Sequence, residues 1–172
     1  PNSLVLGNNW QEVSGDFIIK NNELVNTAGR SGPAIAVQPI IVGDQSTRAS
    51  FASTNNASNP IFGFVLGYQD PQNHYRLYRK AGSPSQLVVS KVVGGVETVL
   101  AHANVPNPLR NRMFELAAYL NPKGLTISTI GGKSLAAQDS TFTTGSVGIL
   151  MGSLVDSPRL LVSHRADNFT AS

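Results

Sequence analysis

The chain has 172 residues, of which 41% are hydrophobic and only 13% are charged, and it contains 16 glycines and 10 prolines. This length is typical of one domain with a single core, so residues 1–172 are expected to form one domain. The low share of charged residues and the many turn-forming residues favour a β-rich domain that works outside the cell.

The composition also argues against several kinds of partner. The net charge of +3 is spread along the chain, and no run of Lys or Arg exceeds the pair Arg79 and Lys80, which disfavours nucleic acid. The chain has no cysteine, so it forms no disulfide, and no apolar stretch approaches the roughly 18 residues of a membrane span. The first residues lack the basic and apolar regions of a signal peptide, so we expect an excised or mature domain without membrane insertion.

Apolar residues alternate with polar ones, or form short runs bounded by Gly, Pro, Asn and Asp, along most of the chain. This pattern predicts strands rather than helices. In chain order the predicted strands are 16–21, 23–28, 34–42, 46–54, 61–69, 74–80, 86–94, 96–104, 113–121, 124–132, 133–140, 145–152 and 159–172.

Turn signals separate these segments, because glycine supplies positive φ, proline presets φ, and Asn or Asp tolerates the left-handed region. They are Asp70–Asn73, Gly82–Pro84, Gly94–Gly95, Asn121–Gly124 and Gly131–Lys133. About a dozen strands at spacings near 8–12 residues predict an all-β fold, a two-sheet antiparallel β-sandwich or jelly roll.

Only residues 111–120 also fit a helix. A helix would group Met113, Leu116, Ala117 and Leu120 on one face. A strand would group Phe114, Leu116, Ala118 and Leu120. A turn signal and a further strand pattern follow directly, which favours a hairpin.

Several motifs follow one another along nearly the whole chain. They are Trp10 with "SGDFII" and "NNELVN", the hairpin from Gly63 to Arg76, the segment from Leu87 to Leu100, "DSTFTTGSVGIL" from Asp139, and "ADNFTA" from Ala166. In this order they resemble the concanavalin A-like lectin/glucanase superfamily, and within it the laminin G-like jelly-roll modules of bacterial secreted and surface proteins. The resemblance implies a concanavalin A-like β-sandwich that acts as a non-catalytic carbohydrate-binding or adhesive module of a larger secreted or cell-surface protein.

The resemblance also implies a structural Ca²⁺ ion held by Asp167 together with carbonyl groups of the N-terminal segment. The simpler interpretation is that Asp167 caps a turn or pairs with Arg165. Asp70 and Asp139 are second choices for calcium, because both are typical turn residues.

The sequence argues against catalysis. Retaining glycosidases place two carboxylates about 5 Å apart, which alternate positions of one strand can supply. None of the glutamates Glu12, Glu23, Glu97 and Glu115 has an acidic residue two places on, and no Gly-x-Ser-x-Gly nucleophile motif occurs. A glycan-processing enzyme is therefore the least favoured alternative, behind a structural or protein-interaction domain without a sugar site.

The strand that follows the Asp70–Asn73 turn carries the predicted ligand site. Alternation points Tyr75 and Leu77 into the core and leaves His74, Arg76 and Tyr78 on the outer face. In the preceding strand, the residues expected to share one face are Phe62, Phe64, Leu66 and Tyr68.

An aromatic ring beside Arg and His donors suits a glycan, because sugars stack their C–H faces on rings while hydroxyls bond to charged groups. His74, Arg76 and Tyr78 are thus the predicted ligand-binding residues. In the alternative, Arg76 pairs with Glu97 or Asp70 and Tyr78 covers apolar surface. Trp10, the single tryptophan, is expected to close one end of the sandwich, with a ligand platform as the other possibility.

Overall fold

The computed structural model describes residues 9–21, 23–26, 32–53, 60–107, 112–129, 132–153 and 164–172. Within these ranges the chain forms β-strands and no helix, so the predicted all-β fold is confirmed. No helix in the described part of the chain is long and apolar enough to cross a bilayer.

The strands are β1 (Gln11–Ser14), β2 (Phe17–Lys20), β3 (Glu23–Asn26), β4 (Gly32–Val42), β5 (Gln45–Ser53), β6 (Pro60–Asp70), β7 (Asn73–Lys80), β8 (Ser85–Val93), β9 (Val96–Val105), β10 (Phe114–Asn121), β11 (Gly124–Thr129), β12 (Ser134–Ala137), β13 (Gly145–Ser153) and β14 (His164–Ala171). Each predicted segment overlaps one of these strands. The pattern missed β1, because its four residues include a single apolar side chain, Val13.

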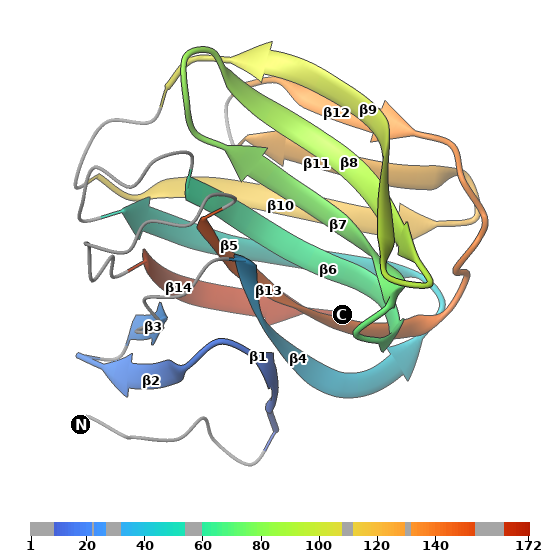
Figure 1. Cartoon of the computed structure of the whole chain (residues 1–172), viewed down its shortest axis with the longest axis horizontal. Helices are drawn as coiled ribbons and strands as arrows, with labels where there is room; N and C mark the ends of the chain where they lie inside the picture. Colours follow the sequence, from blue (N-terminus) through green and yellow to red (C-terminus); the bar gives the residue numbers. More distant parts are fainter. Residues whose placement is uncertain are drawn as a thin grey trace.

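The strands form two antiparallel sheets that pack face to face (Figure 1). The front sheet has the order β1-β4-β13-β6-β7-β8-β9, and the back sheet has the order β12-β11-β10-β5-β14-β3-β2. In Figure 1 the hairpin strands β6 to β9 run side by side, coloured from green to yellow. Strands far apart in sequence, such as β4, β13 and β6, are neighbours, as the long connections of a jelly roll require.

The main core lies between the two sheets and is built from alternate residues of their strands. Phe51 of β5 packs against Phe62 and Phe64 of β6, with ring centroids 6.0 and 5.5 Å apart, and all three side chains are fully buried. Residues 114–121 form strand β10 rather than a helix, and Leu116 and Leu120 enter this core as predicted.

The outer face of the front sheet carries a second apolar cluster, here called the outer cluster. Its buried members are Ile35, Val37, Ile61, Val65, Tyr68, Tyr78, Val88 and Leu150. Polar side chains on this face therefore stand beside buried apolar groups, which raises the cost of leaving them without hydrogen bonds.

The predicted orientation of Tyr68 is wrong. Leu66 faces the main core as expected, but Tyr68 belongs to the outer cluster. The pairing of β6 with β7 shifts register between Leu66 and Asp70, and Gly67 adopts a positive φ of 56°. Such a bulge adds a residue to one strand, so the next side chain changes face.

Candidate functional site

The predicted turn at Asp70–Asn73 is confirmed, and the Asp70 carboxylate organises it. Asp70 Oδ1 accepts the Gln72 backbone N–H at 2.7 Å, and Asn73 Nδ2 donates to both carboxylate oxygens at 3.0 Å. The side chain of Asn73 and then the backbone of Gln72 lower the pKa of Asp70. Asn73 Oδ1 also accepts the Gly94 N–H at 3.1 Å, which ties this turn to the turn between β8 and β9.

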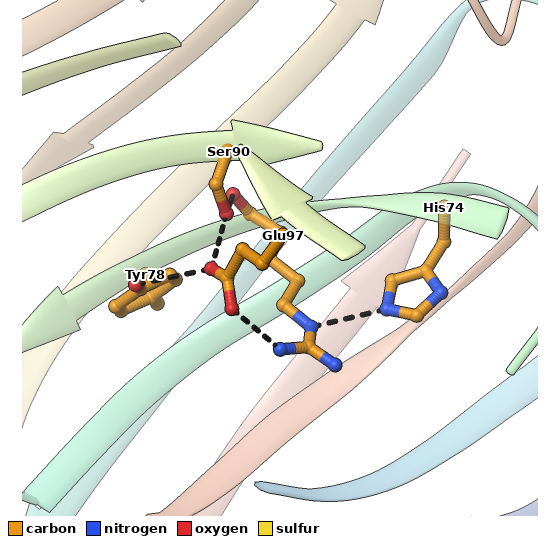
Figure 2. Close-up of polar contacts among 5 residues, drawn as sticks. His74, Tyr78, Ser90 and Glu97 are labelled. Atoms are coloured by element: carbon orange, nitrogen blue, oxygen red, sulfur yellow. Dashed lines mark hydrogen bonds and ion pairs between the residues drawn. The ribbon is translucent and has the colours of Figure 1, made fainter. Parts of the chain in front are cut away.

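Five side chains on the outer face of the front sheet form one polar network (Figure 2). They come from β7, β8 and β9 and are His74, Arg76, Tyr78, Ser90 and Glu97. Arg76 is central, because its Nε–H donates to His74 Nε2 at 3.1 Å and its Nη1 donates to Glu97 Oε2 at 2.8 Å. The network exists because the sheet register sets Arg76 opposite Ser90 and brings Glu97 beside them from the next strand.

His74 is held neutral and in one tautomer. Its Nδ1 lies 3.2 Å from the Asp70 carbonyl oxygen, which can only accept, so Nδ1 carries the proton. Nε2 then has a free lone pair, and this accepts the Arg76 Nε–H. Burial, and after it the Arg76 charge, lowers the pKa of His74 to about 4.

Glu97 accepts hydrogen bonds at both carboxylate oxygens. Oε1 takes the Ser90 hydroxyl at 2.7 Å and the Tyr78 hydroxyl at 3.3 Å, while Oε2 takes Arg76, as Figure 2 shows. Burial, and then the nearby Glu97 charge, raises the pKa of Tyr78. Tyr78 therefore stays protonated and acts as a donor, so the orientation of Glu97 is fixed before any ligand arrives.

The three residues predicted to bind a ligand lie together but differ in exposure. His74 is 0% exposed and Tyr78 is 5% exposed, whereas the side chains of Arg76 and Glu97 keep 15% and 28%. Arg76 pairs with Glu97 and Tyr78 belongs to the outer cluster, which are contacts that the alternative interpretation also expects. A ligand-binding role for the three stays a prediction, and solvent reaches the network at Arg76 and Glu97.

Sequence reasoning missed Ser90 and treated Glu97 only as a partner for Arg76. Ser90 is fully buried, and its neighbours on the same face of β8, Val88 and Val92, are buried valines. A hydroxyl between two apolar residues of one strand face is a usable signal, because a buried polar group needs a hydrogen-bond partner.

A second polar network joins the segment after β12 to the front sheet. Asp139 Oδ1 accepts the Tyr75 hydroxyl at 2.5 Å and the Thr141 backbone N–H at 2.9 Å, and its Oδ2 accepts Lys91 Nζ at 2.7 Å. Burial opposes the charged form, but the hydrogen bonds from Lys91, Thr141 and Tyr75 prevail and hold the pKa of Asp139 well below its usual range. Asp139 therefore anchors a turn and already has its ion-pair partner.

Tyr75→Phe is expected to lower the free energy of unfolding by about 1.5 kcal/mol. The hydroxyl of the fully buried Tyr75 donates to Asp139 and accepts the Phe142 backbone N–H at 3.1 Å, so its removal leaves that N–H without its partner. Urea denaturation measures the change. Tyr119→Phe is the matched control, because Tyr119 is 43% exposed and its loss of the hydroxyl should change stability by less than about 0.5 kcal/mol. Equal effects of the two variants would contradict a structural role for the hydrogen bonds of the Tyr75 hydroxyl.

Asp167 lies within β14 rather than at a turn, and it lines a pocket with Trp10, Gln38 and Phe169. Ca²⁺ prefers six to eight oxygen ligands, but the described side chains of this pocket supply one carboxylate and one amide among apolar groups. Nowhere in the described ranges do three His, Cys, Asp or Glu residues gather as a metal site. The described side chains therefore do not fit a calcium ion. The expected carbonyl donors of residues 1–8, and the side chain of Arg165, lie outside the described residues.

Trp10 packs at the border of the main core, as expected for a residue that closes one end of the sandwich. Its ring packs against Phe169, with centroids 4.8 Å apart and planes tilted by 56°, and the pair borders the main core. The same ring also lines the pocket beside Asp167.

No family model matches the chain, and no curated protein matches it. Solved structures do match. The carbohydrate binding module CBM66 from Bacillus subtilis is 15% identical with a TM-score of 0.78, over 95% of this chain and 94% of that one. The VIP36 exoplasmic/lumenal domain in its Ca²⁺/Man₃GlcNAc-bound form is 13% identical with a TM-score of 0.68, over 95% and 82%.

A third match is to part of an enzyme. The GH43 BlXynB protein from Bacillus licheniformis is 17% identical with a TM-score of 0.70, over 98% of this chain but only 37% of the enzyme. At these identities the likeness concerns the fold. The chain thus shares the two-sheet β-sandwich fold of these solved structures.

Proposed function

We propose that this chain is a non-catalytic carbohydrate-binding domain, and that Arg76 and Glu97 on the outer face of the front sheet bind a glycan. The observation that carries the proposal is the geometry of this ion pair. Hydrogen bonds with His74, Tyr78 and Ser90 hold the pair in place, and both of its side chains remain partly exposed to solvent.

The pair offers the donors and acceptors that neighbouring sugar hydroxyls need. Arg76 has five N–H groups, and the hydrogen bonds to His74 and Glu97 use two of them. The other three have no partner among the described residues, and they are available to hydroxyl oxygens while Glu97 accepts hydroxyl protons. Because the partners are already held in place, a ligand need not order them, which favours affinity. His74 and Tyr78 then act as positioning residues rather than as direct contacts.

The glutamates support a non-catalytic role. Glu97 is committed to Arg76, Glu115 pairs with Arg48, and Glu12 Oε1 accepts the Phe17 backbone N–H at 2.9 Å. A glycosidase needs a carboxylic acid and a second carboxylate facing the same bond. Glu12 on β1 and Glu97 on β9 lie at opposite edges of the front sheet, and Glu115 lies on β10 of the back sheet, so these three carboxylates do not face one bond.

A protein-interaction role is the second candidate, and it rests on a different observation. Val93, Val96 and Val99, around the β8–β9 hairpin, are 45%, 69% and 53% exposed. Apolar side chains on an edge hairpin suit contact with another protein. Under either role we expect the chain to belong to a larger secreted or cell-surface protein, with other domains of that protein among its partners.

Affinity gel electrophoresis against a panel of neutral and acidic polysaccharides tests the proposal. Wild-type protein should be retarded by at least one polysaccharide, and Arg76→Ala should weaken that binding at least about tenfold, because a charged hydrogen bond contributes about 1.5–3 kcal/mol. Arg48→Ala is the matched control. It also removes an arginine from an ion pair, but on the back sheet with 52% of the side chain exposed, so binding should not change.

Two results would contradict the proposed site. One is equal retardation of Arg76→Ala and wild type. The other is no retardation of wild type by any polysaccharide, which would leave the protein-interaction role as the better account.

A further inference from the structure

Arg79 is a buried cation at one end of the sandwich. It lies near the end of β7, and its side chain points between the sheets, because its strand partners Phe62 and Leu87 both belong to the main core. The residue is only 5% exposed. In Figure 1 this end of the sandwich lies on the left, away from the β6–β7 and β8–β9 turns. Charged residues are rarely buried to this extent unless an opposite charge accompanies them.

The contacts of Arg79 are all with neutral groups. Its Nε–H donates to the Ser85 hydroxyl oxygen at 3.3 Å, and its Nη2 donates to the Pro106 carbonyl oxygen. The guanidinium carbon lies 4.9 Å from the centre of the Phe114 ring, which provides a cation–π contact. Two of the five N–H groups are thus used, and the other three have no partner among the described residues.

No carboxylate balances the charge of Arg79 within the described ranges, since none of the ion pairs found there includes it. Glu115 is next to Phe114 in sequence, but it points to the other face of β10 and pairs with Arg48. The exposed Arg112, two residues before Phe114, adds a second positive charge near this end. Burial lowers the pKa of Arg79, but an arginine still keeps its proton at neutral pH. The buried charge is therefore uncompensated.

Solvent reaches the unpartnered part of this guanidinium group. Among the described residues, Thr47 Oγ1 is the only fully buried side-chain polar atom without a hydrogen-bond partner. Nη1 of Arg79 has no partner either, so it is not fully buried. A small anionic group can therefore approach Nη1 while the core stays packed.

A structural role alone does not account for a charge at this position. Holding the Ser85 hydroxyl and the Pro106 carbonyl requires N–H donors, which a neutral amide side chain also supplies. Arginine differs from an amide in its positive charge and in its planar fork, which matches a carboxylate through two parallel hydrogen bonds. Because an unpaired buried charge is costly, a bound carboxylate would also relieve that cost.

We propose that Arg79 binds the carboxylate of an acidic sugar, a uronic acid unit of a polysaccharide, at this end of the sandwich. That the carboxylate belongs to a sugar rests on the proposed carbohydrate-binding function, whereas the anion site itself rests on the environment of Arg79. The site is separate from that of Arg76, which projects from the opposite face of β7 beside Ser90.

Thermal unfolding in the presence of monosaccharides tests this site, because a ligand that binds only the folded state raises the melting temperature. The wild type is heated with sodium D-glucuronate or D-galacturonate, with D-glucose or D-galactose as neutral counterparts, and with sodium acetate as a carboxylate without a ring. Sodium chloride keeps the ionic strength equal. At least one uronate should raise the melting temperature in a saturable way, with an affinity at least tenfold above those of its neutral counterpart and of acetate.

Variants assign the response to Arg79. Arg79→Met keeps a long side chain against Phe114 but removes the charge and the donors, and it should weaken uronate binding at least tenfold. Arg79→Lys keeps the charge without the planar fork and should retain part of the binding. Lys20→Gln is the matched control for net charge, because Lys20 is exposed on β2 at the edge of the back sheet, and it should bind as the wild type does. Arg112→Gln, at an exposed position, should weaken binding severalfold and serves if the Arg79 variants fail to fold.

Four results would overturn the proposal. They are an equal uronate response in Arg79→Met and wild type, an affinity for acetate equal to that for the uronates, loss of the response in Arg76→Ala, and, if the Arg79 variants do not fold, an unchanged response in Arg112→Gln. Retardation by polysaccharides that depends on Arg76 can persist in each of these cases except the third. A uronate response that depends on Arg79 can likewise persist if Arg76→Ala leaves retardation unchanged, so the two proposals can fail separately.

Discussion

The Phe51→Ala substitution is expected to lower the free energy of unfolding by about 3–5 kcal/mol relative to the wild type. Phe51 is fully buried, and its ring lies 6.0, 5.5 and 6.1 Å from those of Phe62, Phe64 and Phe114. It projects from β5 of the back sheet onto β6 of the front sheet, so its loss opens a cavity at the contact between the layers. Urea denaturation of the purified variant measures the effect.

Two further variants serve as controls for this prediction. The free energy of unfolding of a small domain is only about 5–15 kcal/mol, so Phe51→Leu is included as a smaller change that keeps the protein folded. Phe114→Ala removes the same ring from a partly buried position at the rim of the cluster, and it should cost less than Phe51→Ala. A larger loss of unfolding free energy for Phe114→Ala than for Phe51→Ala would contradict the central position of Phe51 in the core. Phe51→Leu should retain polysaccharide binding, because the proposed site lies on the opposite face of the front sheet.

The strands could be predicted from the sequence because their signals are local. Alternating side chains and the Gly, Pro, Asn and Asp turns mark every strand except β1, and the β6–β7 turn at Asp70–Asn73 is one example. The face of Tyr68 was not predictable in this way. The bulge before it is supported from far along the chain, since Gln45 Oε1 accepts the Gly67 N–H at 2.9 Å.

The candidate site was predictable in position but not in burial. Alternation assigns His74, Arg76 and Tyr78 to one face, and the structure confirms that they share it. Alternation does not say how a face is covered. Here the outer cluster, with Val65 and Leu150 fully buried, is assembled from strands that are distant in sequence, and it buries His74 and Tyr78 while Arg76 keeps contact with solvent.

The stability of the protein is expected to fall by about 3 kcal/mol as the pH drops from 6.5 to about 4, in addition to any general acid effect. His74 has an ordinary pKa of 6.5 when unfolded and a pKa of about 4 in the fold, because burial and Arg76 disfavour its charged form. The unfolded chain therefore binds a proton first as pH falls. The contribution is complete above pH 6.5 and is lost as pH falls through about 4. Urea denaturation across this range measures it.

His74→Gln is the variant that isolates this effect, because glutamine keeps a hydrogen-bonding side chain but does not titrate. Its stability should change about 3 kcal/mol less between pH 6.5 and 4 than that of the wild type, and an unchanged slope would show that His74 is not the titrating group. Asp139, whose pKa is also lowered, loses its contribution in the same direction but only below its unfolded value of 3.8, so the two windows are distinct. Protonated His74 would turn Nε2 into a second donor facing Arg76, so polysaccharide binding should fall together with stability.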